Sequence, residues 1–235
     1  MRKARALRPG IEVHKIVECG SSPYLLVEHA RRADMLVMGR NPDHPLGSGF
    51  LGSVGTQVIT HAPGLVTIVQ EPDIPPEAQP GQVVVGVDGS ATARLALRTA
   101  FEEARLRRLP LTAVCAWLPE ARVKAAPFLS DQDLPLICRE RFEHEVASVG
   151  ADYPEVEATA VFRTGDPATC LLAAAAEARL LVVGSRGMGA VRSFLLGSVG
   201  HAVAHRAPCP VTVVHPPEQA EKPDPAQEEG PARAR

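Results

Sequence analysis

The chain has 235 residues, and its 25 lysines and arginines nearly balance 27 aspartates and glutamates, for a formal net charge of −2. This balance excludes the basic excess of nucleic-acid-binding proteins and the acidic excess of polyanion mimics. Apolar residues make up 45% of the chain but aromatic residues only 4%. The core must therefore consist of Ala, Val and Leu, a composition typical of helices packed on a buried parallel sheet.

The cysteines are scattered, odd in number and without a Cys-x-x-Cys pair, which predicts buried free thiols rather than disulfides. They are Cys19, Cys115, Cys138, Cys170 and Cys209. No apolar run is long enough for a membrane span, and the basic start lacks the apolar stretch of a signal peptide. We therefore expect a soluble cytoplasmic protein with neither a membrane nor a nucleic-acid partner.

The first third of the chain alternates short apolar runs with helix signals. Residues 1–7 are expected to end a helix, residues 11–17 to form a strand, and a helix to begin at Ser21 or Ser22. Two further strands are expected at residues 35–38 and 65–69. Residues 71–82 are rich in Pro and polar side chains, which predicts a linker.

The rest of the chain continues the alternation. Strands are expected at residues 83–87, 111–116, 156–162, 180–183 and 211–214. Helices are expected from a cap at Ser90 to about Arg108, over residues 133–149, from a cap at Asp166 to about Ala178, and from Gly197 to about Arg206. Alternating strands and helices indicate an α/β fold with a parallel sheet. Residues 216–235 carry too few apolar side chains to order themselves and are predicted to be a disordered tail.

An internal repeat organises these elements. Residues 9–70 match residues 154–215 without a gap, so that Gly39 aligns with Gly184. The sequence Gly-Ser-Val-Gly occurs at residues 52–55 and again at 197–200. A register held through two loops indicates two copies of one supersecondary unit.

The two copies differ in length. We predict a partial domain at residues 1–70, with only the third to fifth strands of the unit, and a complete domain at residues 83–215. These are called below the N-terminal copy and the C-terminal copy. We expect the true start to lie upstream, because a three-stranded remnant would expose an unpaired sheet edge. The alternative is a degenerate half-domain.

Glycines and a serine in the C-terminal copy form the main candidate site. Gly184 and Gly187 follow the fourth strand, and Gly197 and Ser198 open the next helix. Glycines let backbone approach a ligand, and a helix N-terminus binds phosphate. We expect the first two glycines to pass under ribose and phosphates, and Gly197, Ser198 and Val199 to hold the phosphate end. The alternative is a glycine-rich turn with an ordinary serine cap, since short motifs alone are weak signals.

Asp88 closes the first strand of the C-terminal copy. In doubly wound sheets, ligands bind beyond the carboxyl ends of the strands, where the strand order reverses. If the first and fourth strands are neighbours there, Asp88 and Gly184 face one crevice, and the carboxylate can accept hydrogen bonds from sugar hydroxyls. The alternative is that Asp88 only orders the turn into the helix.

The spacing Gly184-x2-Gly187-x9-Gly197-Ser198, with Asp88 ending the first strand, resembles the universal stress protein family in its ATP-binding branch. The resemblance covers nearly all of residues 9–70 and 83–215. It implies an open five-stranded parallel sheet in the order 3-2-1-4-5, flanked by helices, a Rossmann-like fold of the adenine nucleotide alpha hydrolase type. It also implies ATP with Mg²⁺ as the ligand, contacted by Asp88, Ala116, Gly184, Gly187, Gly197, Ser198 and Val199, with the Ala116 backbone at the adenine.

Family members pair through their fifth strands. The resemblance therefore implies that residues 66–69 pair with residues 211–214 within one chain, with a homodimer as a further prospect. The N-terminal copy departs from the motif, because Pro42 stands where Gly187 stands in the other copy and the strand that carries the Asp is missing. Proline removes an N–H group and fixes φ. We predict that this copy binds no nucleotide.

Other candidates are weaker. His201 and His205 share a helix face, but no third metal ligand is evident, so no metal site is expected. Arg186 and Arg192 lie in the site loop and either neutralise phosphate or remain solvated. No nucleophile or general base is identifiable, so the leading hypothesis is an ATP-binding stress-response module that is at most a weak ATPase. The rivals are an enzyme that hydrolyses ATP or transfers a nucleotidyl or phosphoryl group, and a dimerisation module that binds no nucleotide.

Overall fold

The computed structural model describes residues 6, 8–40, 51–69, 81–118, 133–187 and 196–216. The helix end expected at residues 1–7, the loop around Pro42, Arg192, and most of the linker and of the tail lie outside the described residues. The extents of linker and tail therefore stay predictions.

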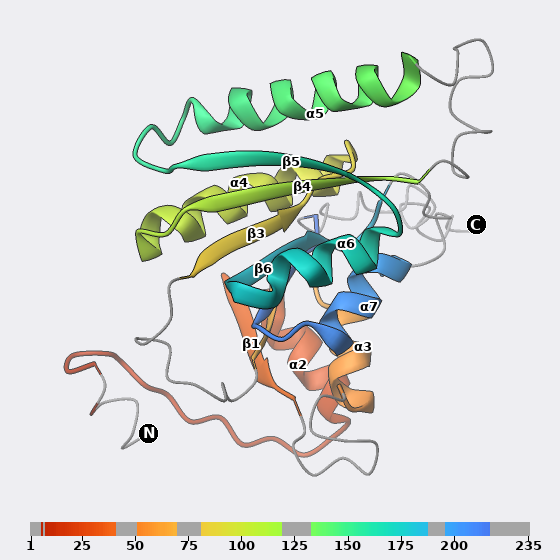
Figure 1. The fold of residues 1–235 in the computed structure, drawn as a ribbon. Coiled ribbons are helices and arrows are strands. Elements are labelled where there is room, and N and C mark those ends of the chain that lie inside the picture. Colours follow the sequence, from red (N-terminus) through yellow and green to blue (C-terminus); the bar gives the residue numbers. More distant parts are fainter. Residues whose placement is uncertain are drawn as a thin grey trace, which may run out of the picture.

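Seven strands of the described chain form one sheet in the order β1-β2-β7-β6-β3-β4-β5 (Figure 1). Neighbouring strands run parallel except for β2 and β7, which are antiparallel. An α/β fold with a mostly parallel sheet is confirmed, but the sheet joins both copies and has seven strands rather than five. The strands are β1 (Met35–Gly39), β2 (Leu65–Val69), β3 (Gln82–Gly86), β4 (Leu111–Trp117), β5 (Ala158–Thr164), β6 (Ala178–Gly184) and β7 (Val211–Val214).

The five strands of the C-terminal copy follow the expected order. Along the sheet they lie third, second, first, fourth and fifth, as β5-β4-β3-β6-β7. The strand order reverses between β3 and β6, which pair in parallel with Val85 opposite Val182. The carboxyl ends of β3 and β6 therefore lie side by side, at the position where doubly wound sheets bind ligands.

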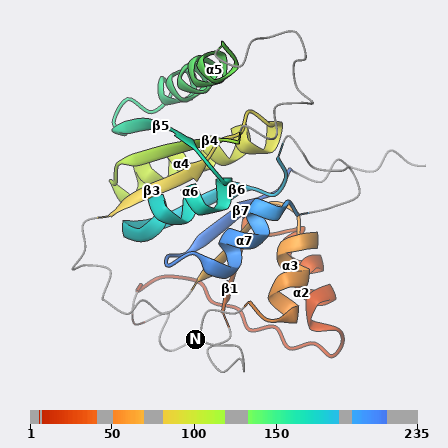
Figure 2. The same ribbon diagram turned by 45° about the vertical axis from the view of Figure 1, so that its right-hand side comes forward.

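Helices cover both faces of the sheet (Figure 2). On one face, Phe101 and Phe142 pack in one apolar cluster with Val83 and Val85 of β3. On the other face, Leu171 packs in a second cluster with strand residues that point the opposite way, among them Val84 and Leu181. The helices are α2 (Ser22–Ala30), α3 (Ser53–His61), α4 (Ala91–Arg107), α5 (Asp133–Gly150), α6 (Pro167–Ala174) and α7 (Ser198–Arg206).

Two predicted helix starts in the C-terminal copy are confirmed. The Ser90 hydroxyl accepts a hydrogen bond from the N–H of Ala93 at 3.1 Å, and the Asp166 carboxylate accepts one from the N–H of Thr169 at 2.8 Å. Both are N-caps that satisfy first-turn donors. The helix expected to run to about Ala178 is α-helical to Ala174 and continues as a 3-10 turn over Ala175–Glu177. It ends there because Ala178 pairs with Gln82 of β3.

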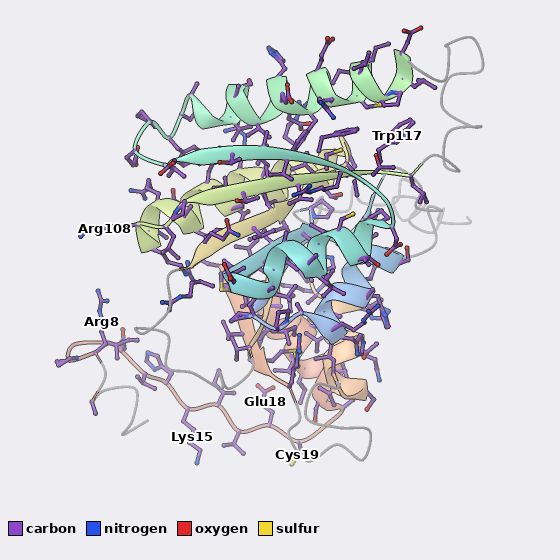
Figure 3. The ribbon with its side chains drawn as sticks, in the orientation of Figure 1. Arg8, Lys15, Glu18, Cys19, Arg108 and Trp117 are labelled. Atoms are coloured by element: carbon purple, nitrogen blue, oxygen red, sulfur yellow. The ribbon has the colours of Figure 1, made fainter. Side chains whose placement is uncertain are left out.

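The strand predicted at residues 11–17 does not form. This segment is extended but outside the sheet, and Ile16 and Val17 are 64% and 78% exposed. In the C-terminal copy the third strand, β5, pairs only with the second, β4. The described residues of the N-terminal copy include no second strand. Without that partner the backbone has no ladder to join. Figure 3 shows the segment, marked by Lys15 and Glu18, along the lower edge of the molecule.

Two smaller differences from the sequence predictions concern the start of β5 and the exposure of the cysteines. Strand β5 begins at Ala158 rather than Val156, because its ladder with β4 starts where Ala158 lies opposite Leu111. All five cysteines are free, as expected, but only Cys209 is buried, whereas Cys115, Cys138 and Cys170 are half-buried and Cys19 is exposed. None of the helices in the described ranges combines the length and apolar character that a membrane crossing requires.

The two copies adopt the same local structure. Helices α3 and α7 have equivalent bounds, and the register of β1 on β2, with Leu36 opposite Val66, recurs in β6 on β7, with Leu181 opposite Val211. In each copy, the N–H of the first residue after the fourth strand donates a hydrogen bond to the end of the fifth strand. Arg40 donates to the Val69 carbonyl at 3.0 Å and Ser185 to the Val214 carbonyl at 2.8 Å. The sequence repeat is a structural repeat.

The two copies meet at β2 and β7, the fifth strands of the unit. Thr67 lies opposite Thr212, its own equivalent, and their buried hydroxyls hydrogen-bond at 2.8 Å. Because equivalent residues face each other, the junction has local two-fold character. This is the intrachain pairing that the family resemblance implies. A homodimer through the same strands stays a prediction.

Candidate functional site

Two loops meet at the strand-order reversal of the C-terminal copy. One follows β3 and contains Asp88 and Ser90, and the other follows β6 and contains Ser185 to Gly187. Because β3 and β6 run parallel and in register, both loops leave the same edge of the sheet. The N-termini of α4 and α7 open at this edge as well. The sequence thus correctly places Asp88 beside the glycine loop.

The Asp88 carboxylate lies against the backbone of Gly187. A Cβ atom added to Gly187 would overlap Oδ2 of Asp88, so the close approach depends on glycine. The other oxygen, Oδ1, accepts a hydrogen bond from the N–H of Ser90 at 3.0 Å. Asp88 therefore orders the turn into α4, and its exposed side chain also faces the glycine loop. The interpretation that Asp88 orders the turn into α4 is confirmed, and its contact with ribose hydroxyls stays a prediction.

Gly184 has a different structural role. A Cβ atom there would lie 2.9 Å from the carbonyl carbon of Thr92 and 3.1 Å from the nitrogen of Ala93. These atoms belong to the first turn of α4. The absence of a side chain at Gly184 thus lets the end of β6 pack closely against α4. This packing holds the loop at residues 185–187 beside the first turn of α4.

Hydroxyl groups of α4 anchor the loop. The carbonyl oxygen of Arg186 accepts hydrogen bonds from Oγ of Ser90, at 3.3 Å, and from Oγ1 of Thr92. The sequence identified Ser90 only as a helix cap and did not identify Thr92. A threonine two residues after a cap carries no local signal of a partner more than ninety residues away.

The start of α7 lies at the position expected for the phosphate end. Gly197 is the N-cap of α7, and its N–H donates to the Ser185 carbonyl at 2.7 Å. Ser198 and Val199 occupy the first turn, where N–H groups have no intrahelical acceptor and the helix dipole is positive. The Ser198 side chain is exposed, while Val199 is half-buried. Of the three residues expected at the phosphate end, Gly197 thus uses its N–H group within the loop, and the contacts of Ser198 and Val199 with phosphate stay predictions.

Ala116 lies at the same sheet edge. Gly86 of β3 is opposite Val114 of β4, so Ala116 and Asp88, each two residues further on, reach the same level. The strand continues one residue beyond the expected end, to Trp117, which is labelled in Figure 3. Ala116 is half-buried, and its placement fits an adenine position at the far side of Asp88 from the glycine loop.

The adjacent thiol is chemically inert. Burial raises the pKa of Cys115 to about 12, with smaller contributions from the charges of Cys138, Asp88 and Glu145. The thiol is therefore neutral near pH 7 and does not act as a nucleophile. The same interactions place the Asp88 carboxylate near Cys115.

The histidine pair lies on α7, one turn apart. The rings of His201 and His205 have centroids 4.4 Å apart. Among the described residues, no group of three or more His, Cys, Asp and Glu side chains is arranged to hold a metal ion. Burial, then the charges of His201 and Arg40, lower the pKa of His205.

Comparison with known proteins agrees with this architecture. Two universal stress proteins of Mycobacterium tuberculosis (strain ATCC 25618 / H37Rv) are similar to the chain. One is 37% identical over 193 residues, covering 80% of this chain and 64% of the relative. The other is 35% identical over 207 residues, covering 86% and 68%. The chain thus spans about two thirds of the length of these relatives.

The fold is shared with a solved structure. A universal stress protein from Archaeoglobus fulgidus DSM 4304 superposes with a TM-score of 0.67 at 22% identity, covering 92% of this chain and 72% of that one. The model of the Universal stress protein family matches residues 1–70 and 81–215. With the repeat and the sheet order described above, this match shows that the chain belongs to the universal stress protein family.

Proposed function

We propose that the C-terminal copy binds ATP with Mg²⁺ at the edge formed by β3, β6 and the start of α7, and that the protein acts as a cytoplasmic stress-response module signalling through the occupancy of this site. The observation that carries the proposal is the approach of the Asp88 carboxylate to the backbone of Gly187 at the strand-order reversal. A side chain on Gly187 would fill the space between the two loops. Open α/β sheets bind nucleotides at this position.

The residues fit an adenine nucleotide in a consistent order. Ala116 offers backbone groups to the adenine, Asp88 accepts hydrogen bonds from ribose hydroxyls, and the loop at Gly187 passes beneath the phosphates. Ser198 and Val199 donate N–H groups to the terminal phosphates, where the dipole of α7 adds positive potential. Mg²⁺ supplies charge neutralisation of the phosphate oxygens and commonly keeps several of its own water ligands.

Calorimetric titration of the full chain with ATP and Mg²⁺ tests the proposal. We expect one site per chain, and we expect Gly187→Ala to weaken binding strongly because its methyl group meets Asp88. Gly52→Ala is the matched control, since Gly52 is the equivalent of Gly197 in the N-terminal copy and a Cβ there meets no atom within 4 Å. Absence of binding at millimolar ATP overturns the proposal, and two sites per chain contradict the assignment to one copy.

A turnover assay separates this binding module from an enzyme. The neutral Cys115 thiol and the Asp88 carboxylate bonded to Ser90 support binding rather than catalysis. We therefore expect at most weak ATP hydrolysis that differs little between the wild-type chain and Asp88→Ala once both are saturated with ATP. Rapid turnover that is lost in the variant would favour a hydrolase or a nucleotidyl or phosphoryl transferase.

The junction between β2 and β7 favours an assembly role for the N-terminal copy. Its fifth strand is already paired within the chain. This role is compatible with nucleotide binding in the C-terminal copy. A module devoted to assembly alone predicts that ATP does not raise the melting temperature, whereas a bound nucleotide stabilises the folded chain in proportion to its saturation.

A further inference from the structure

A buried polar cluster lies behind the glycine loop. Ser185 is 0% exposed and His215 is 8% exposed. Within the described part of the chain, Oγ of Ser185, Nε2 of His215 and Nε of Arg186 are buried without a hydrogen-bond partner. Buried polar atoms are nearly always paired in folded proteins, so three unpaired atoms beside a candidate site call for an explanation.

Ser185 and His215 occupy matching positions at the ends of neighbouring strands. Strands β6 and β7 pair in parallel up to Gly184 and Val214, and the two residues come next. The N–H of Ser185 donates to the carbonyl of Val214 at 2.8 Å, which continues the ladder by one step. Residues at the same level of adjacent strands direct their side chains to the same face, so the Ser185 and His215 side chains leave the sheet on the same face.

His215 also belongs to the junction between the two copies. Its N–H donates to the carbonyl of Gly64 at 2.9 Å. Burial lowers the pKa of the His215 ring to about 4, against a hydrogen bond with the backbone of Ile59 that raises it and the charge of Arg186 that lowers it. The ring is therefore neutral near pH 7, with one nitrogen as donor and the other as acceptor.

Backbone hydrogen bonds run from this junction to the start of α7. His215 donates to Gly64 in the N-terminal copy, and Ser185 donates to Val214, the residue before His215. The carbonyl of Ser185 then accepts from the N–H of Gly197 at 2.7 Å. Gly197 precedes the N–H groups assigned above to phosphate. The N-terminal copy is thus connected to the phosphate end of the site through Ser185.

We propose that His215 is a positioning residue through which the N-terminal copy holds the loop at residues 184–187 and the start of α7 in the form that binds nucleotide. This inference rests on the function proposed above. In the bound form, the Ser185 hydroxyl donates to Nε2 of His215, which pairs two of the three unpaired atoms. The N-terminal copy thereby contributes to a site in which none of its own residues touches the nucleotide.

The test compares ATP affinity across variants of the full chain by calorimetry. We expect His215→Leu to raise the dissociation constant roughly tenfold, as for coupling between sites of ordinary strength. His215→Gln keeps a polar group in the junction and is expected to recover most of the affinity, and Ser185→Ala is expected to bind severalfold more weakly than wild type. His61→Leu is the matched control, because His61 is an exposed histidine at the end of α3.

Hydrogen exchange supplies a second readout that a merely structural residue would not alter. Binding energies couple reciprocally, so ATP is expected to slow exchange of the His215 amide in the wild-type chain and in His61→Leu, but not in Ser185→Ala. If wild type binds no ATP, the proposed function itself fails. If wild type binds ATP and folded His215→Leu, His215→Gln and Ser185→Ala bind equally well, the positioning role is overturned while the site stands.

Discussion

The two copies share a sequence pattern and a strand register, yet their fourth strands, β1 and β6, have opposite environments. Val182 of β6 is 0% exposed, whereas its equivalent in β1, Val37, is 55% exposed. Strand β6 lies between β3 and β7 and packs against α4, while β1 is the last strand of the sheet. The comparison teaches that an apolar strand is buried by the elements beside it and not by its own composition.

The same contrast reaches the loops after these strands. Ser185 follows β6 and its carbonyl accepts a hydrogen bond from Gly197 at the start of α7. The equivalent residue after β1 is Arg40. Arg40 is 9% exposed, and burial lowers the pKa of its guanidinium group, against an opposing effect of Cys209 in the other copy. A long charged side chain thus packs toward the other copy where the C-terminal copy has a small hydroxyl. This difference supports the proposal of one nucleotide site per chain.

Replacing a valine by aspartate in β6 and in β1 is the most severe test of their different environments. Val182→Asp buries an unpaired carboxylate in the core and is expected to cost at least about 4 kcal/mol of unfolding free energy. Val37→Asp is expected to cost less than about 1 kcal/mol, because the side chain remains in water. Urea unfolding of both variants measures the difference. A large loss for Val37→Asp would show that this edge is covered in solution.

The buried junction histidine, His215, predicts a pH dependence of the stability of the folded chain. The folded pKa of His215, about 4, lies below the ordinary value of 6.5, so the unfolded chain binds more protons between these values. Stability is therefore complete above about pH 6.5 and falls as the pH drops toward 4. Between pH 7 and pH 5 the loss from this group is on the order of 2 kcal/mol.

Urea unfolding at the two pH values, with wild type and His215→Gln, isolates this contribution. The variant is expected to be less stable at pH 7 but to lose less stability on acidification. An equal loss in both chains would contradict the assignment to His215. His144→Gln, at an exposed position on α5, is the control for removal of a histidine.

Adding one methyl group at the equivalent glycines Gly184 and Gly39 compares the packing at the ends of β6 and β1. Gly184→Ala places a Cβ 2.9 Å from the Thr92 carbonyl carbon, whereas Gly39→Ala meets no atom within 4 Å. Overpacking against backbone is expected to cost about 1–3 kcal/mol in the first variant and nearly nothing in the second. Thermal unfolding measures both. Equal costs would mean that β6 and α4 are less closely packed than the structure has them.

The hydroxyl pair across the β2–β7 junction gives the smallest effect. Thr67→Val leaves the buried Thr212 hydroxyl without this partner and is expected to cost about 1 kcal/mol. Thr212→Val is expected to cost less, because the Thr67 hydroxyl keeps its hydrogen bond to Sδ of Met35 at 3.3 Å. The double variant replaces both partners with similar shapes and is expected to cost less than the sum of the single variants. A double-mutant cycle in urea measures the coupling. Strict additivity would indicate that the two hydroxyls do not interact across the junction.

Sequence patterns alone established much of the architecture. The repeat, the alternation of strands and helices and the caps at Ser90 and Asp166 follow from apolar spacing and capping residues, which act over a few positions. The order of the five strands in the C-terminal copy came with the family resemblance. The site residues Asp88 and Gly187 were found as candidates because a strand end followed by glycine has a local signature. Their roles in binding stay predictions.

Tertiary structure alone decided the remaining features. Residues 11–17 have the pattern of a strand but lack a partner strand, and Ala178 follows an alanine-rich helix but pairs with Gln82. The hydroxyl of Thr92 at the Arg186 carbonyl, and Ser185 beside His215, join residues distant in the chain. Such contacts carry no local signal, because hydrogen bonding and burial depend on which elements become neighbours when the sheet assembles.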